Sequence, residues 1–214
     1  MTGIELFIKT LQHWGVPFIS TLCGNGLNPL DEACHNNGLR LVDVRNEQAA
    51  AYMADAYGRL TGRPGVCSSS SGVAHVNALT GVLNAYFDGA PMLLVTGCGD
   101  TATMGLGHFQ DVDQVALAEP ICKYARLIDR VELVPEILFE AWSAAINGRP
   151  GPVHITFPQD MMLAEIDPAQ PDQIPTPPER VVVAGDPLQI TEAVKLLQEA
   201  QCPLIIAGSG VFYA

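Results

Sequence analysis

Short apolar runs alternate along the chain with longer stretches in which apolar residues recur every three or four positions. The short runs are typical of buried strands, and the longer stretches have the period of amphipathic helices. The pattern predicts strands at 16–22, 39–44, 65–70, 92–96, 121–128 and 153–157, and helices at 4–14, 28–37, 46–60, 73–87, 111–117 and 134–146. This alternation indicates an α/β fold with a doubly wound, six-stranded parallel sheet and helices on both faces.

The composition changes after residue 158, and this change divides the chain. A proline-rich polar stretch at 167–178 has no periodicity, which is typical of an extended linker. We expect a first domain at 1–165, a linker at 166–185 and the start of a second α/β domain at 186–214, with a helix at 187–199 and a strand at 203–207. One helix and one strand cannot bury both their faces, so we expect this second domain to be truncated.

The balance of residue types excludes some partners. Hydrophobic residues make up 48% of the 214 residues and charged residues only 16%, below the roughly 25% of ordinary soluble domains. We expect such a chain to bury surface against a second copy, as a homodimer or tetramer. Eleven Lys and Arg against 23 Asp and Glu give a net charge of −12, which argues against binding to nucleic acid.

Two further features bear on the compartment. The most apolar stretches are shorter than the roughly 20 residues that cross a bilayer, so no membrane partner is expected. The six cysteines are scattered, with no Cys-x-x-Cys pair and no clustering with histidine. This spacing favours free thiols in a reducing compartment over a disulfide framework or a zinc site, and we expect a cytoplasmic protein.

Candidate binding residues follow the predicted strands, at the edge where parallel sheets bind ligands. Gly24 and Asn25 follow the first strand, Glu47 follows the second, and Gly72 follows the third. Glu47 begins an alanine-rich helix, and small side chains allow close packing and a water-poor setting for a carboxylate. A first-turn acid also commonly serves only the helix dipole, and position alone favours that alternative.

Three motifs carry a family resemblance. Residues 46–62 read NEQAAAYMADAYGRLTG, and the next helix places Gly72, Asn77, Gly81, Asp88 and Pro91 at a set spacing. A third motif is Phe-Gln-Asp at 109–111, followed by Asp113. In order and spacing these motifs resemble the N-terminal, pyrimidine-binding domain of thiamine-diphosphate-dependent enzymes, in the acetohydroxyacid-synthase-like branch. The resemblance covers about the first 160 residues.

The resemblance implies roles for individual residues. Glu47 matches the glutamate that hydrogen-bonds N1′ of the aminopyrimidine, so that the exocyclic nitrogen can take the thiazolium C2 proton and form the ylid. The catalytic candidates are Glu47 and Gln110, and the substrate candidates are Phe109 and Gln110. The cofactor-binding candidates are Gly24, Asn25, Glu47, Gly72, Val73 and Asn77. No metal ligand is expected in this chain.

Several alternatives stay open. Asn77 could instead cap or bridge buried backbone, Phe109 could be a core residue, and Gln110 could order its loop. His75 and His108 are expected to be exposed, or buried with their ring nitrogens bonded, and not catalytic. The family's usual Gly-Pro-Gly is Gly-Val-Ala at 72–74 in this chain, and that departure suggests a reshaped pocket.

The family's diphosphate site, a Gly-Asp-Gly with a later Asn-Asn, has no match here. The Gly-Asp pairs at 99–100 and 185–186 lack the second glycine, and the Asn-Asn pair at 36–37 precedes both. The resemblance therefore implies thiamine diphosphate shared with the diphosphate-binding domain of another subunit, which would hold Mg2+. It leaves open FAD in the central domain, and we expect this polypeptide alone to be inactive.

The resulting function is the thiamine-diphosphate-binding part of an acetolactate-synthase-like transferase or lyase. Such an enzyme is a carboligase or decarboxylase whose substrate is a small 2-oxo acid. The alternative is a non-catalytic dimerisation or regulatory domain of the same fold that has lost the cofactor site. A nicotinamide-binding domain is disfavoured, because no Gly-x-Gly-x-x-Gly opens a first helix after a strand.

Overall fold

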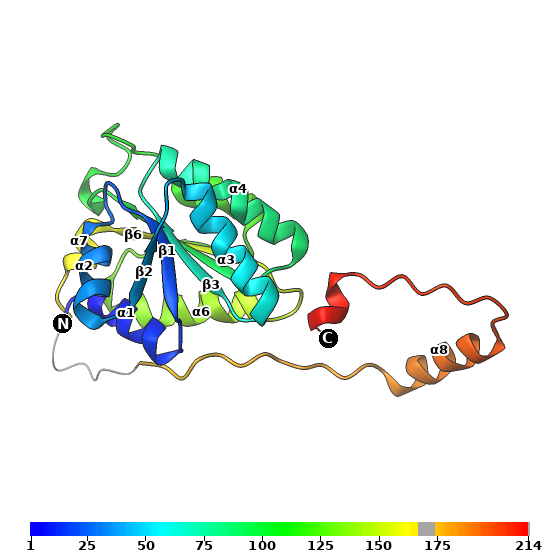
Figure 1. Cartoon of the computed structure of the whole chain (residues 1–214). Coiled ribbons are helices and arrows are strands. Elements are labelled where there is room, and N and C mark those ends of the chain that lie inside the picture. The colour runs from blue at the N-terminus through cyan, green and yellow to red at the C-terminus, as the bar shows by residue number, and fades with distance from the viewer. Residues whose placement is uncertain (167–173, 214) are drawn as a thin grey trace.

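Six parallel strands form the centre of the structure, a computed structural model that describes residues 1–166 and 174–213 (Figure 1). The sheet order is β2-β1-β3-β4-β6-β5, and every neighbouring pair is parallel. The strands are β1 (Phe18–Leu22), β2 (Arg40–Asp43), β3 (Gly65–Ser69), β4 (Met92–Cys98), β5 (Ala125–Leu127) and β6 (Pro152–Pro158). The predicted fold class is confirmed.

Helices connect the strands and cover both faces of the sheet. They are α1 (Gly3–His13), α2 (Asn28–Asn37), α3 (Glu47–Thr61), α4 (Val73–Asp88), α5 (Gln114–Ala118), α6 (Val134–Ile146), α7 (Gln159–Leu163) and α8 (Pro187–Glu199). Short 3-10 turns are η1 (Thr101–Thr103), η2 (Glu119–Ile121), η3 (Val131–Leu133) and η4 (Ser209–Tyr213). Five of the six strands and seven of these helices lie close to their predicted ranges.

Two predicted strands differ from the structure. The strand expected at 121–128 is only Ala125–Leu127, because residues 119–121 form a 3-10 turn around Pro120. The strand expected at 203–207 is wrong: those residues are in no strand, and no described strand lies beside them to supply the pairing bonds. Of the linker expected at 166–185, residues 167–173 lie outside the described part of the chain.

Large apolar side chains fill the face covered by α1, α2 and α6. Phe7 of α1 meets Phe157 of β6 edge-on, with ring centroids 5.6 Å apart. Trp14, at the end of α1, meets Trp142 of α6 in the same way at 5.3 Å. Successive residues of a strand point to opposite faces, so this face receives every second residue of the central strands.

The other face is covered by α3 and α4, which lie side by side in Figure 1. Small residues form the contact between the two helices. A Cβ on Gly81 would lie 2.5 Å from the Cβ of Ala51 and 2.9 Å from the backbone nitrogen of Tyr52. Further along α3, a Cβ on Gly58 would collide with the carbonyl oxygen of Pro91, in the segment between α4 and β4. The backbones therefore approach one another as closely as glycine and alanine allow.

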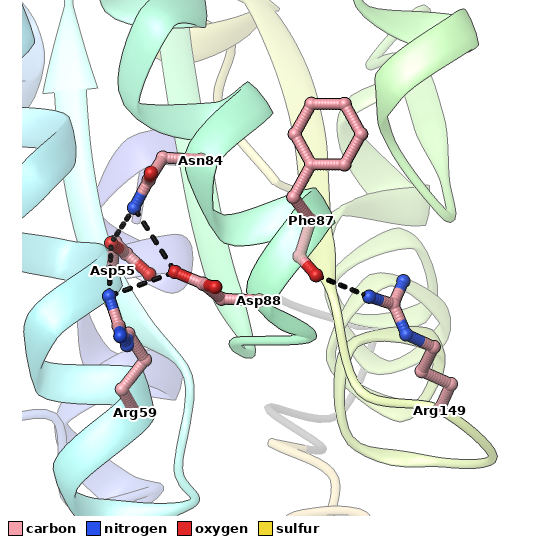
Figure 2. A network of polar contacts seen from close by, with 6 residues as sticks. All are labelled: Asp55, Arg59, Asn84, Phe87, Asp88 and Arg149. Atoms are coloured by element: carbon pink, nitrogen blue, oxygen red, sulfur yellow. Dashed lines mark hydrogen bonds and ion pairs between the residues drawn. The ribbon is translucent and has the colours of Figure 1, made fainter. Parts of the chain in front are cut away.

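Polar contacts join the carboxyl ends of α3 and α4 (Figure 2). Asn84 Nδ2 donates a hydrogen bond to Asp55 Oδ2 at 2.7 Å, and Arg59 Nη1 lies 2.9 Å from Asp88 Oδ2. Burial raises the pKa of the Asp55 carboxyl. Arg149 Nη2 donates to the carbonyl oxygen of Phe87 at 2.7 Å, which satisfies one of the free carbonyls at the end of α4.

The chain after residue 173 touches the sheet domain at a few points. Trp14 Nε1 donates to the carbonyl oxygen of Pro175 at 2.7 Å, and the backbone N–H of Val181 donates to Asn147 Oδ1 at 2.7 Å. Helix α8 forms as predicted but buries none of its residues, and it lies apart from the sheet in Figure 1. None of the helices in the described ranges is long and apolar enough to span a bilayer.

Candidate functional site

The loops after β1 and β3 meet at a point where the chain reverses its direction of winding. After β1 the chain enters α2 on one face of the sheet, and after β3 it enters α4 on the other face. Such a switch point at the carboxyl ends of parallel strands is the usual ligand site of open α/β sheets. Asn25 Nδ2 crosses this point and donates a hydrogen bond to Ser71 Oγ at 3.4 Å.

Glu47 is the first residue of α3, directly after β2. The side chain of Asn46 caps this helix by accepting the backbone N–H of Gln48 at 2.8 Å. Asn77 Nδ2, from α4, donates to Glu47 Oε2 at 2.5 Å, and Gln48 Nε2 donates to Asn77 Oδ1 at 2.9 Å. Gln48 therefore keeps the donor end of the Asn77 amide turned toward the carboxylate.

An open groove of about 470 Å³ lies beside Glu47. One wall comes from the first turns of α4, where the Val73 side chain is 73% exposed, and Asn77 forms part of the floor. The water-poor setting expected for Glu47 is not present in this chain by itself, because the carboxylate is half-buried. The alanines of α3 pack against the sheet and α4, and they leave the groove side open. The lining residues are Glu47, Val73, Ala74, Val76, Asn77 and Thr80.

The groove fits the pyrimidine half of thiamine diphosphate and not the diphosphate half. A carboxylate beside valine and alanine side chains suits a flat heterocycle with polar ring nitrogens. No basic side chain lines the groove, so nothing there would pair with a diphosphate. Within the described residues, no three His, Cys, Asp or Glu side chains gather where they could hold a metal ion.

Gln110 forms a second cluster with the loop after β3. Its side-chain Oε1 accepts a hydrogen bond from Ser71 Oγ at 3.1 Å, and its backbone has a φ of 61°. That conformation is uncommon for a residue with a side chain and often marks a functional loop. Gly72 also has a φ of 61°, and a Cβ there would lie 2.6 Å from the Cβ of Gln110. Glycine is therefore required at position 72.

The predicted site residues thus form two groups. Glu47, Val73 and Asn77 share the groove, and Asn25, Gln110 and Gly72 meet around Ser71. Two residues stand outside both groups. Phe109 is 78% exposed and does not line the groove, and it is not a core residue. Gly24 lies against Ser70, where a Cβ would be 2.7 Å from the serine Cβ, so it serves close backbone packing.

The two histidines differ from one another. His108 is exposed, as expected. His75 is fully buried, and neither ring nitrogen has a partner among the described residues, so the expectation that it would be exposed or hydrogen-bonded is wrong. Its ring centroid lies 4.7 Å from that of His154 on β6, and burial lowers the pKa of His75 to about 4. His75 is on the inner face of α4, where the helix period allows no exposure.

Three polar residues of the site were missed in the sequence. Gln48 and Ser71 are neighbours of predicted residues, and their polar character next to Glu47 and Gly72 is the signal that could have found them. Gln114 is 3% exposed, and its side chain bonds to Gly72 and Gly97, two residues remote from it in the chain. No local pattern indicates such contacts.

A larger cavity of about 900 Å³ lies between the loop before α5 and strand β5. It is lined by Arg126 and by several carboxylates, and it does not include Glu47. Its acidic character would repel a carboxylate or a phosphate. The groove at Glu47 is therefore the better candidate, although it is smaller.

Comparison with known proteins agrees with the geometry. The profile of the family described as "Thiamine pyrophosphate enzyme, N-terminal TPP binding domain" matches residues 1–117. A probable acetolactate synthase large subunit of Methanocaldococcus jannaschii is 39% identical over 99% of this chain and 36% of that protein. The acetolactate synthase large subunit of Corynebacterium glutamicum is 34% identical over 100% of this chain and 34% of that protein.

A relative with a different name matches nearly as well. The 2-hydroxyacyl-CoA lyase 1 of Dictyostelium discoideum is 33% identical over 100% of this chain and 37% of that protein. The chain spans little more than a third of the length of these relatives. The profile match covers more than half of the chain and includes the Glu47 helix and the α4 helix. The chain therefore belongs to the thiamine pyrophosphate enzyme family and carries its N-terminal cofactor-binding domain, of the acetolactate-synthase-like kind.

Proposed function

We propose that Glu47 binds and activates the pyrimidine ring of thiamine diphosphate in an enzyme that joins or decarboxylates 2-oxo acids. The main support is the position of the Glu47 carboxylate. It belongs to the first residue of α3, faces a groove with apolar walls and accepts a hydrogen bond from Asn77. A side chain that served only the helix dipole would need neither the groove nor the amide contact. No described residue bonds to Glu47 Oε1, which leaves that oxygen to meet a ring nitrogen.

The chemistry divides between the cofactor and this chain. When bound, thiamine diphosphate supplies a carbon nucleophile that adds to the carbonyl group of a 2-oxo acid. The task of Glu47 is to hold a proton at a ring nitrogen, and a carboxyl group does this best where water is excluded. Asn77 keeps Oε2 in place, so that Oε1 keeps a single direction toward the groove.

The open side of the groove implies a second surface. Exposed apolar side chains continue from the groove along one face of α4 at the spacing of successive turns, namely Val73, Val76, Leu83 and Phe87. A stripe of this kind on a helix is typical of a buried interface. We assign it to a partner subunit in a homodimer or tetramer, whose diphosphate-binding domain would hold the diphosphate with Mg2+ and close the groove. The scattered free thiols suit a cytoplasmic enzyme.

Residues 186–214 are assigned to the start of a second domain, after a linker. Helix α8 has one apolar face that is exposed along its whole length, with Ile190 at 53% and Leu197 at 51%. Apolar residues at 204–206 are exposed as well. These surfaces need further structure to cover them. Binding of FAD to that domain can be tested only in the full-length protein.

Phe109 and Gln110 are assigned to the substrate. Both lie on the loop before α5, and the exposed ring of Phe109 is free to pack against a small 2-oxo acid or the partner subunit. Two of these relatives are named acetolactate synthases and one is named a 2-hydroxyacyl-CoA lyase, so we favour acetolactate synthesis and take pyruvate as the 2-oxo acid to test. The competing proposal is a non-catalytic domain of the same fold. It is supported by Gly-Val-Ala at 72–74, where the family usually has Gly-Pro-Gly.

The test uses the full-length protein that carries this sequence and the variant Glu47→Gln. The amide keeps the shape of the side chain but cannot ionise, so we expect thiamine diphosphate still to bind. Exchange of the thiazolium C2 proton with deuterated water, followed by nuclear magnetic resonance, should slow by a factor of about 10² to 10⁴. Carboligation of pyruvate should fall in parallel.

Glu136→Gln is the matched control, because Glu136 is also in the first turn of a helix but is exposed on the opposite layer. It should change neither rate. Wild-type C2 exchange in Glu47→Gln would contradict the role of Glu47. Absence of thiamine diphosphate binding to the unmodified protein, in a calorimetric titration, would favour the non-catalytic domain.

A further inference from the structure

Gln114 is a buried amide that bonds to two loops at once. Its Oε1 accepts the backbone N–H of Gly72 at 3.3 Å, and its Nε2 donates to the carbonyl oxygen of Gly97 at 3.2 Å. The side chain is 3% exposed, and both backbone groups lie in buried residues. Buried backbone groups need hydrogen-bond partners, and the glutamine supplies one to each of these two groups.

Each end of the amide holds a different part of the site. Gly72 immediately precedes α4, so its position sets where Val73 and Asn77 stand beside the groove. Gly97, at the end of β4, lies against Gly26 of the loop after β1, and a Cβ at Gly97 would collide with the Gly26 carbonyl oxygen. The same glutamine therefore holds the turn before α4 and the end of β4.

Gln114 also fixes its own segment. It is the first residue of α5, and it lies four residues after Gln110. Gln110 has its left-handed backbone and contacts Ser71, the neighbour of Gly72. The loop that carries Phe109 and Gln110 is thus attached to the β3–α4 turn at two points, Ser71 and Gly72. Two attachments define the orientation of a loop, whereas one would allow it to pivot.

We propose that Gln114 is a positioning residue that holds the Phe109–Gln110 loop and the start of α4 in register with Glu47. This inference rests on the proposed function. The Gly72 end of the amide holds the start of α4 beside the cofactor groove. The Gly97 end anchors Gln114, and with it the loop that precedes α5, to the end of β4. Gln114 itself touches neither ligand in this assignment, and it acts through the backbone of its neighbours.

Two variants of the full-length protein separate the two ends. Gln114→Met removes both bonds and keeps a side chain of similar length. We expect the Kd for thiamine diphosphate and the KM for pyruvate each to rise about tenfold, with kcat little changed. Gln114→Glu keeps an acceptor for Gly72, and its ionised form has no donor for Gly97. Since burial favours the neutral acid, which could still donate, this variant is measured at the alkaline end of the pH range in which the protein is folded. It should therefore keep the wild-type Kd while KM rises about tenfold.

A second readout does not depend on catalysis. Hydrogen exchange followed by mass spectrometry, on the protein without cofactor, reports the loops directly. Amides at 105–113 should exchange at least about tenfold faster in both variants, and those at 71–76 only in Gln114→Met. Gln159→Met is the matched control, since Gln159 is also the first residue of a five-residue helix and is half-buried. It should leave all four measurements unchanged.

The outcomes distinguish this proposal from the proposed function. Variants that only lower the thermal midpoint, with exchange, Kd and KM unchanged, would show a purely structural glutamine and overturn the inference. Faster exchange without any change in Kd or KM would overturn it too. Failure of the proposed function would appear instead in Glu47→Gln, as unchanged C2 exchange. If Gln114→Met does not fold, Gln114→Glu still tests the proposal, because KM should rise in this variant while Kd stays at the wild-type value. An unchanged KM in Gln114→Glu would then overturn the inference.

Discussion

The two faces of the sheet are built on opposite principles. The face under α1, α2 and α6 is filled by large apolar side chains, among them Phe7, Phe157 and Trp142. The face under α3 and α4 is filled by small ones, and near the carboxyl ends of the strands it buries polar groups such as His154 and Thr96. The first face supplies hydrophobic burial, whereas the second controls how closely two helix backbones approach.

That difference explains where the site lies. Glu47 and Ala51 are one turn apart on α3, and Asn77 and Gly81 are one turn apart on α4. The close contact between Ala51 and Gly81 therefore sits one turn below the hydrogen bond between Asn77 and Glu47. Small residues bring the helices together so that their first turns can share a bond. The geometry of the candidate site depends on helix distance at this face, whereas the other face contributes hydrophobic burial.

The largest expected effect comes from the first face. Phe7→Ala removes a fully buried ring from its contact with Phe157, and it should lower the free energy of unfolding by about 4 kcal/mol. Affinity for thiamine diphosphate should not change in the molecules that remain folded. Urea denaturation and calorimetric titration of the full-length protein measure the two quantities.

The matched control for that variant is Phe139→Ala on α6, where the ring is 40% exposed. It should cost no more than about 0.5 kcal/mol. If Phe7→Ala weakened cofactor binding at temperatures where the protein is fully folded, the two faces would not be independent, and the comparison would fail.

An intermediate effect comes from the second face. Gly81→Ala places a methyl group 2.5 Å from the Cβ of Ala51, so α3 and α4 must separate. We expect a loss of about 2 to 3 kcal/mol in the free energy of unfolding. Unlike Phe7→Ala, it should also weaken thiamine diphosphate binding, because the bond from Asn77 to Glu47 lengthens. Denaturation and titration again give both values.

The double variant Ala51→Gly with Gly81→Ala moves one methyl group across the same contact. It should restore only part of the cofactor affinity, because the new methyl group still lies 2.9 Å from the backbone nitrogen of Tyr52. The glycine within α3 also costs about 1 kcal/mol of its own. Unchanged affinity in the single variant, or no recovery in the double variant, would mean that helix separation does not control the site.

The sequence predicts the strands and helices better than it predicts the contacts between the loops of the candidate site. The strands and most of the helices follow from periodicity, and Asn46 before Glu47 and Gly62 after α3 mark the helix ends. The burial of His75 could also be inferred from the sequence, because His75 lies on the same side of the helix as Ala78 and Val82. The expectation that a histidine is exposed or hydrogen-bonded was given more weight. The local sequence pattern is therefore sufficient for features that a single helix or strand determines, such as its ends and its buried side.

The rest of the site depends on several loops at once. The left-handed backbone of Gln110 and the two bonds of Gln114 arise only when the loops after β3 and β4 are in place. The half-buried state of Glu47 could not be predicted either, since it depends on the open groove beside the first turns of α4, which no local pattern describes. The strand expected at 203–207 failed for a similar reason, because strands form only beside other strands.

The smallest expected effect tests the polar part of the second face through pH. Burial lowers the pKa of His75 to about 4, from about 6.5 in an unfolded chain, and also lowers that of His154. The unfolded state therefore binds more protons between these values, so stability is complete above pH 6.5 and falls as the pH drops. Between pH 7 and pH 5, His75 alone should remove about 2 kcal/mol from the free energy of unfolding.

Urea denaturation at several pH values between 5 and 7 measures this slope, in a range above that of most carboxyl groups. His75→Leu should flatten it by the amount that His75 contributes, while His35→Gln, on the exposed side of α2, should leave it unchanged. Among the residues that the structure describes, the buried histidines are His75 and His154, both on the α3–α4 face, so Phe7→Ala should shift the whole curve without changing its slope. A slope that is unchanged in His75→Leu would exclude His75 as a source of the pH sensitivity, whereas the part that remains in this variant is expected from His154.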